Sequence, residues 1–299
     1  MTVESQEIAL PLGGGEDALA GIDFGGAGEG PEVLLVHGSG HNAAAWTDVA
    51  AHLLPYCGRL VAVDLRGHGR TTLDSTRADQ YWRDLGDAVA ALGWRRPVLV
   101  GHSLGGYAVT AVTAAGLVEP AAVCTVDGLV LDDRPTAARR HAGWQRPSAQ
   151  QELRTMFHYG WRAGTAERDA HIERAVRDAP TDWLNAGARA GLVRELTARS
   201  FSPDDPHGTR WLRRPTVEEM VTLNTPDPAD TVYPTIDVYD RVRCPLTVVL
   251  ATRGFYAHRK EEIVALTAAR PDRTLIELDS HHNIPTAHPA TLAAIIKAL

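Results

Sequence analysis

Short apolar runs recur along the chain, and each ends at glycine, aspartate or serine. Their richness in valine, leucine and isoleucine is typical of strands buried on both faces. We expect six such strands, at residues 31–38, 59–67, 97–103, 121–128, 245–254 and 274–280. Helical patterns lie between most of them, at residues 43–54, 78–92, 104–116, 258–269 and 289–299. Alternating strands and helices require crossover connections, so the pattern predicts an α/β fold with a mostly parallel central sheet flanked by helices.

Two regions depart from this alternation. Residues 7–12 and 18–24, joined by a glycine-rich turn, predict an antiparallel hairpin at the sheet edge. Between about residues 133 and 240 the chain has helical patterns, at 148–159 and 165–177, but no convincing buried strand. Because strand-like segments resume at Pro245, we interpret residues 133–240 as an inserted helical cap (lid). Residues 1–132 and 241–299 then form one core domain.

The composition favours a globular protein that acts on a small molecule. A chain of 299 residues with 44% hydrophobic residues can bury a large core. Its net charge of −7 argues against a nucleic-acid partner, because nucleic-acid binders usually carry a concentrated basic surface. No apolar run reaches the roughly 18 residues of a membrane helix, and the first residues lack the pattern of a signal peptide. We therefore expect a cytoplasmic protein without a membrane partner, while its oligomeric state stays undetermined.

The segment VLVGHSLGGYAV, residues 98–109, places Ser103 between glycines directly after an apolar run. This is the strand, turn and helix context of the G-x-S-x-G nucleophile turn. Glycines two residues before and after the serine avoid collisions in so tight a turn. The amide of Leu104 lies where it would donate to an oxyanion, and the following helix directs its positive end at the serine. The alternative is a glycine-rich turn whose serine only caps a helix.

Four segments in order resemble the α/β-hydrolase superfamily: VLLVHGSG (33–40), VAVDLRGHGRT (61–71), VLVGHSLGG (98–106) and SHHNIPTAHP (280–289). The resemblance implies that Ser103 is the nucleophile and that the amide of Ser39 is the second oxyanion donor. In the last segment the spacing of two prolines aligns His282 with the family's catalytic histidine. His281, which occupies the usual glycine position, is the alternative.

The acidic residue departs from the common family pattern. Most relatives carry an aspartate just after the penultimate strand, where this chain has none, and Glu261 lies inside the following helical pattern. A subset of the superfamily places the acid after the strand that follows the nucleophile helix, which here ends at Asp127. We expect Asp127 to orient the histidine, with Asp132, Asp133 and Glu261 as alternatives.

These residues predict a serine hydrolase, similar to carboxylesterases and lactonases, that cleaves an ester, lactone or thioester of a mainly apolar small molecule through an acyl-enzyme. Such chemistry needs no metal or organic cofactor, and the cysteine and histidine spacing predicts no metal site. The cap contains the aromatic segment MFHYGW, so Met156, Phe157, Tyr159 and Trp161 are candidates for the substrate pocket. The alternative for each of them is that it only packs the cap onto the core. The alternatives are a carbon–carbon cleaving enzyme, a lyase or a cyclase on the same fold and, less favoured, a non-catalytic ligand receptor.

Overall fold

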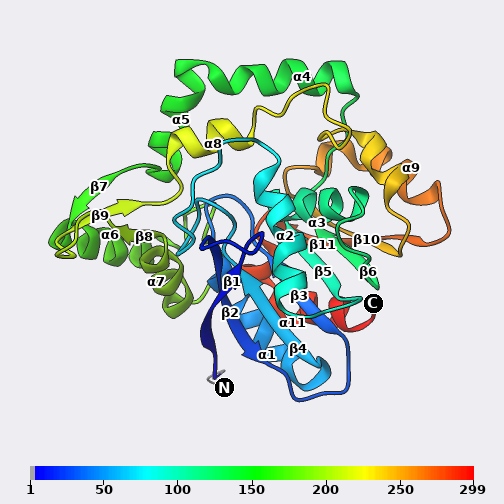
Figure 1. The fold of residues 1–299 in the computed structure, drawn as a ribbon, viewed down its shortest axis with the longest axis horizontal. Helices are drawn as coiled ribbons and strands as arrows, with labels where there is room; N and C mark the ends of the chain where they lie inside the picture. Colours follow the sequence, from blue (N-terminus) through cyan, green and yellow to red (C-terminus); the bar gives the residue numbers. More distant parts are fainter. Residues whose placement is uncertain (1–3) are drawn as a thin grey trace.

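An eight-stranded sheet forms the centre of the molecule in the computed structural model, which describes residues 4–299 (Figure 1). The strand order is β1-β2-β4-β3-β5-β6-β10-β11. The bounds of these strands are β1 (Gln6–Pro11), β2 (Ala18–Gly25), β3 (Glu32–Val36), β4 (Arg59–Val63), β5 (Val98–His102), β6 (Ala122–Val126), β10 (Leu246–Arg253) and β11 (Arg273–His281). All six strands expected to be buried are present, and the predicted α/β class is confirmed.

Every neighbouring pair from β4 to β11 is parallel, whereas β2 runs antiparallel to both β1 and β4. The predicted hairpin is therefore confirmed, and it occupies one edge of the sheet. Side chains of β3 alternate between the two faces, with Leu34 and Val36 in one apolar cluster and Val33 and Leu35 in the other. Parallel strands covered on both faces explain the nearly continuous apolar runs in the sequence.

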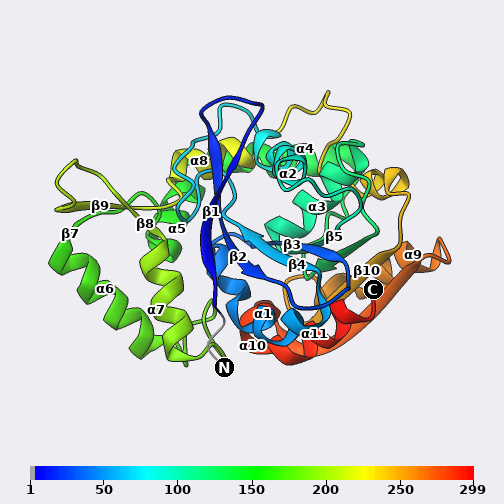
Figure 2. The same ribbon diagram turned by 60° about the horizontal axis from the view of Figure 1, so that its bottom comes forward.

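Helices cover both faces of the sheet (Figure 2). One face packs against α2 (Gln80–Ala91), α3 (Leu104–Ala114) and α9 (Lys260–Ala268). The other packs against α1 (Thr47–Leu53), α10 (Ile284–Ala287) and α11 (Pro289–Lys297). In the part of the chain that the structure describes, none of the helices is both long enough and apolar enough to span a bilayer.

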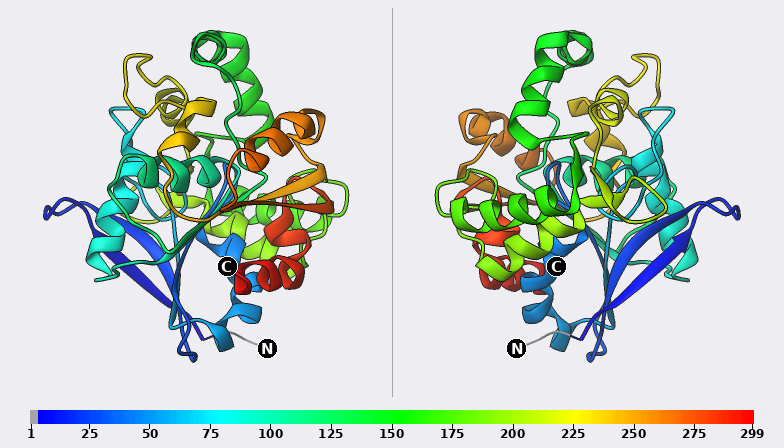
Figure 3. Two further views of the ribbon diagram at one scale, coloured as in Figure 1. Left: turned by 90° about the vertical axis from the view of Figure 1, so that its right-hand side faces the viewer. Right: turned by 90° about the vertical axis from the view of Figure 1, so that its left-hand side faces the viewer.

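The segment inserted between β6 and β10 contains strands that the sequence pattern did not predict (Figure 3). Its helices are α4 (Arg134–Ala142), α5 (Pro147–Phe157), α6 (Thr165–Asp178), α7 (Ala190–Arg199) and α8 (Val217–Leu223). Three further strands form a small antiparallel sheet in the order β7-β9-β8, at β7 (Arg162–Gly164), β8 (Phe201–Pro203) and β9 (Arg210–Arg213). The insertion thus contains helices, as expected, and in addition three short strands that were not expected. Strands of three or four residues are too short to produce a recognisable alternating pattern.

A buried ion pair joins this insertion to the core. Arg199, the last residue of α7, contacts Asp64 after β4 at 2.9 Å, and the side chains are 4% and 0% exposed. The same guanidinium contacts Glu7 on β1 at 2.5 Å. Because an isolated buried charge is costly, Arg199 and Asp64 each depend on the other for burial in the fold.

Candidate active site

A sharp turn between β5 and α3 carries Ser103. Its backbone has φ +53° and ψ −118°, a conformation that residues other than glycine rarely adopt. A Cβ atom on Gly101 would lie 2.1 Å from the carbonyl oxygen of Gly105, and one on Gly105 would lie 2.3 Å from that of Val36. Both separations are far below van der Waals contact, so the turn requires glycine at the two positions where the sequence places it.

Ser103, His282 and Asp127 are joined by two hydrogen bonds. The Nε2 atom of His282 lies 3.0 Å from Oγ of Ser103, and its Nδ1 atom lies 2.6 Å from Oδ2 of Asp127. A carboxylate can only accept, so Nδ1 carries the proton and Nε2 accepts from the serine hydroxyl. The three side chains come from the ends of β5, β6 and β11, and the fold brings them together across more than 150 residues of sequence.

The carboxylate of Asp127 is fully buried and fixed by backbone amides at the end of β10. Its Oδ1 accepts from Ala251 at 3.1 Å, and its Oδ2 accepts from Phe255 at 3.2 Å. A Cβ atom on Gly254 would lie only 2.3 Å from Oδ2, so that glycine leaves room for the carboxylate. An acid after β6 therefore reaches the turn after β10, the position from which most family members supply it.

The residues considered as alternatives to Asp127 and His282 make their contacts outside the site. Asp132 pairs with two arginines at 2.5 and 2.6 Å. Asp133 caps α4 by accepting from the amide of Thr136, and Glu261 is exposed on α9. His281 is exposed at the end of β11, paired with β10. None of these four side chains is hydrogen-bonded to Ser103 or His282 among the contacts of residues 4–299.

Two aromatic rings lie close to the imidazole of His282. The ring of Phe255 stacks on it with centroids 3.9 Å apart and planes inclined by 21°. His102 lies 4.8 Å away, and its Nε2 atom donates to the backbone carbonyl of His282 at 3.0 Å. Neither Phe255 nor His102 was singled out by the sequence analysis. The position of Phe255 just after the penultimate strand was the one signal that could have drawn attention to it.

The two residues expected to supply oxyanion donors lie next to Ser103. Leu104 begins α3 directly after the serine, and a helix N-terminus of this length favours negative charge nearby. Ser39 follows β3 in a loop so close that a Cβ atom on Gly38 would lie 2.7 Å from Cβ of Ser103. Ser39, Ser103 and Leu104 all line one cavity.

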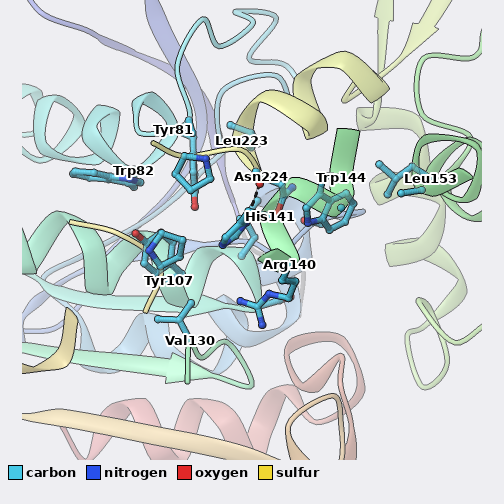
Figure 4. A pocket seen from close by; sticks show the side chains of 18 of the residues that line it. Tyr81, Trp82, Tyr107, Val130, Arg140, His141, Trp144, Leu153, Leu223 and Asn224 are labelled. Carbon is cyan, nitrogen blue, oxygen red and sulfur yellow. Dashed lines mark hydrogen bonds between the residues drawn. The ribbon is translucent and has the colours of Figure 1, made fainter. Parts of the chain in front are cut away.

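That cavity has a volume of about 580 Å³ and lies between the core and the inserted segment (Figure 4). Its size is within the range of about 300–1,000 Å³ that is typical of small-molecule sites. Aromatic side chains form much of its lining, among them Tyr81, Trp82, Tyr107, Trp144 and Phe157. Within residues 4–299, no cluster of three or more histidine, cysteine, aspartate or glutamate side chains is arranged to hold a metal ion.

Of the four candidate pocket residues, Met156 and Phe157 line the cavity, whereas Tyr159 and Trp161 do not. Helix α5 ends at Phe157 because His158 adopts a left-handed conformation with φ +57°. The chain then turns away, so Tyr159 is buried behind Phe157, with the rings stacked 4.7 Å apart. Trp161 packs instead within the insertion, where its ring contacts other cap aromatics. The expectation for these two residues is therefore wrong.

The sheet, the strained serine turn and the buried histidine–carboxylate pair define the α/β-hydrolase class. The model of the Alpha/beta hydrolase family matches residues 33–295, so the chain belongs to that family. The mouse protein phosphatase methylesterase 1 is 38% identical over 108 residues, which cover 33% of this chain and 28% of the mouse protein. The chain thus matches well under half of the length of that curated relative.

Two solved structures resemble the whole fold. The E-2-(acetamidomethylene)succinate hydrolase has a TM-score of 0.73 at 17% identity, covering 99% of this chain and 98% of the other. The thioesterase domain from the curacin biosynthetic pathway has a TM-score of 0.71 at 18% identity, covering 98% and 99%. At these identities the likeness establishes the fold alone.

Proposed function

We propose that the protein is a serine hydrolase that cleaves an ester, lactone or thioester of a mainly apolar small molecule through an acyl-enzyme. The observation that carries the proposal is the pair of hydrogen bonds from Ser103 through His282 to Asp127, with Ser103 lining the cavity. The partial similarity to a methylesterase supports acyl transfer as the reaction class.

Acylation begins when the Oγ atom of Ser103 attacks the carbonyl carbon of the substrate. His282 takes the hydroxyl proton on Nε2 and becomes an imidazolium, which the carboxylate of Asp127 stabilises. The oxygen of the substrate carbonyl gains negative charge, and the backbone amides of Leu104 and Ser39 donate hydrogen bonds to it. The imidazolium then protonates the leaving group as the tetrahedral intermediate collapses.

Deacylation repeats these steps with water as the nucleophile. His282 removes a proton from the water, the second tetrahedral intermediate forms in the same oxyanion site, and Ser103 leaves with its proton restored. The aromatic lining of the cavity suits an apolar substrate, because its burial releases water from both surfaces.

The test is a burst experiment with p-nitrophenyl esters, combined with labelling by a fluorophosphonate probe. We expect one equivalent of rapid p-nitrophenol release, covalent labelling at Ser103, and loss of both in Ser103→Ala. Full turnover in Ser103→Ala would overturn the proposal. A lyase or cyclase that uses the serine only as a base or hydrogen-bond donor would leave Ser103 unlabelled.

A further inference from the structure

One histidine of the inserted segment, His141 on α4, is among the residues that line the cavity (Figure 4). Its side chain is 8% exposed, and its Nδ1 atom lies 2.8 Å from the backbone carbonyl oxygen of Asn224. The Nε2 atom is buried and has no hydrogen-bond partner among the described residues 4–299. Buried polar atoms are paired in the great majority of cases, so this exception needs an explanation.

The state of this imidazole follows from its one partner. A carbonyl oxygen only accepts, so Nδ1 must carry the proton. Burial lowers the pKa of His141 and is the largest effect, the Asn224 carbonyl raises it, and the charge of Arg140 lowers it. The opposing charge of Asp132 raises the pKa least. Near neutral pH the ring is therefore uncharged, and Nε2 presents a lone pair that accepts a hydrogen bond.

The charged groups around the cavity exclude an anionic ligand at this position. The cavity is lined by one arginine, Arg140, which is already paired with Asp132 at 2.6 Å. Three carboxylate side chains also line it: Asp79, which is paired with two arginines at 2.6 and 2.7 Å, and Glu152 and Asp230, which form no ion pair among the described residues. A carboxylate ligand would meet this excess of negative charge, and it has no proton to donate to Nε2 of His141.

A hydroxyl group matches both the acceptor and the surrounding walls. It donates one hydrogen bond to Nε2, and its oxygen can accept one in return. Phenol groups of Tyr81 and Tyr107 line the same cavity, and burial keeps them protonated by raising the pKa of each well above its usual value. An ammonium group donates but cannot accept, so it would use only half of this arrangement.

We propose that the substrate ester carries a hydroxyl group, as a phenol or an alcohol, that donates to Nε2 of His141 when the ester occupies the cavity beside Ser103. The assignment of an ester rests on the proposed function, whereas the hydroxyl recognition rests on His141 and the cavity. His141 is then a specificity-determining residue that contacts substrate away from the reacting carbonyl.

Three matched esters test this inference: p-nitrophenyl 3-(4-hydroxyphenyl)propanoate, its 4-methoxy analogue and the unsubstituted 3-phenylpropanoate. The methoxy group keeps the oxygen but has no proton to donate. One net hydrogen bond to a neutral acceptor is worth about a tenfold preference, so we expect kcat/KM to be about tenfold higher for the hydroxyl ester than for either analogue. Equal values for all three esters would overturn the proposal.

Two variants of His141 and one matched control locate the effect. His141→Phe keeps the ring but removes the acceptor, so the preference should fall to about one, whereas His141→Gln retains an acceptor and should preserve part of it. His171→Phe changes another buried cap histidine, one that does not line the cavity, and should leave the preference intact. Each preference is a ratio within one variant, so a general loss of activity cancels. An unchanged preference in His141→Phe would refute the assignment.

A binding measurement with compounds that are not hydrolysed tests this inference independently of the proposed function. Calorimetry with 3-(4-hydroxyphenyl)propanamide and 3-phenylpropanamide, which are poor substrates for hydrolysis, should give about tenfold tighter binding of the phenol to the wild-type protein and equal binding in His141→Phe. If no ester is turned over and Ser103 is not labelled, the proposed function fails, but this difference in binding still supports the hydroxyl site. If the esters are turned over but the hydroxyl compounds and their analogues do not differ in binding or in kcat/KM, the hydroxyl site is refuted and the proposed function stands.

Discussion

Replacement of Asp127 by asparagine is the sharpest test of the proposed mechanism. The substitution keeps the size of the side chain and removes its charge. In the structure the carboxylate accepts three hydrogen bonds, from Ala251, Phe255 and His282. The asparagine amide has only one accepting oxygen. In either orientation its NH₂ group therefore faces a backbone N–H, that of Ala251 or that of Phe255, and this N–H loses its acceptor.

The expected loss follows from these contacts. The amide cannot stabilise an imidazolium 2.6 Å away, and in one orientation it donates to Nδ1 of His282 and moves the ring proton to Nε2. The imidazole then donates to the hydroxyl of Ser103 and no longer accepts from it. The same change in a serine protease lowers kcat by about 10⁴, which corresponds to about 5 kcal/mol of activation free energy. The unpaired backbone donor should lower the free energy of unfolding by about 1–3 kcal/mol.

The assay is kcat with a p-nitrophenyl ester, measured beside the melting temperature so that loss of fold is distinguished from loss of catalysis. Glu261→Gln is the matched control, because Glu261 is an exposed carboxylate on α9 with no contact to His282 among the described residues. We expect kcat near the wild-type value in the control. A folded Asp127→Asn protein with turnover within tenfold of wild type, together with an inactive Glu261→Gln, would refute the reasoning.

Three further predictions concern the surroundings of the site. Phe255→Ala should lower kcat about two- to tenfold by exposing the face of His282 on which the ring stacks, as measured by ester turnover. Arg199→Met leaves the carboxylate of Asp64 buried without its cation and should lower the free energy of unfolding in urea by about 3–5 kcal/mol. Burial lowers the pKa of His68 from its usual 6.5 to about 4 in the folded protein. Between pH 6.5 and pH 4, therefore, His68 is protonated in the unfolded chain but neutral in the folded protein. The free energy of unfolding should therefore fall by roughly 2–3 kcal/mol from pH 7 to pH 4.5 through this residue.

Each of these predictions has its own control. Phe255→Tyr keeps the stacked ring and should retain most of the activity; equal losses in the tyrosine and alanine variants would contradict a stacking role. Arg189→Met breaks an exposed pair, with the arginine 54% exposed, and should cost less than about 1 kcal/mol. A similar cost for Arg199→Met would mean that the buried pair contributes little. His68→Gln does not titrate, so an unchanged fall in stability at low pH would exclude His68 as its source.

Local sequence determined the fold class and much of the site. Apolar runs separated by helical patterns were enough to predict the parallel sheet, because periodicity and β-branched composition act within a few residues. The glycines around Ser103 reflect steric limits of a single turn, which are equally local. The roles of His282 and Asp127 were implied by the resemblance to the α/β-hydrolase superfamily, and the structure joins both side chains to Ser103 through two hydrogen bonds.

Only the tertiary structure determined which other residues contact the residues of the site. The three short strands of the inserted segment pair with one another and carry no periodic pattern, so the sequence favoured helices there. Tyr159 and Trp161 belong to the predicted aromatic segment, yet a left-handed residue at His158 turns them away from the cavity.

The positions of Phe255 over His282 and of His141 in the cavity depend on contacts between residues far apart in sequence. Backbone conformation is set mainly by neighbours along the chain, whereas the partner of a side chain is set by how complete layers of structure pack. For that reason the local sequence was enough to predict the turn that carries Ser103, whereas the residues that surround this serine follow only from the packing of the tertiary structure.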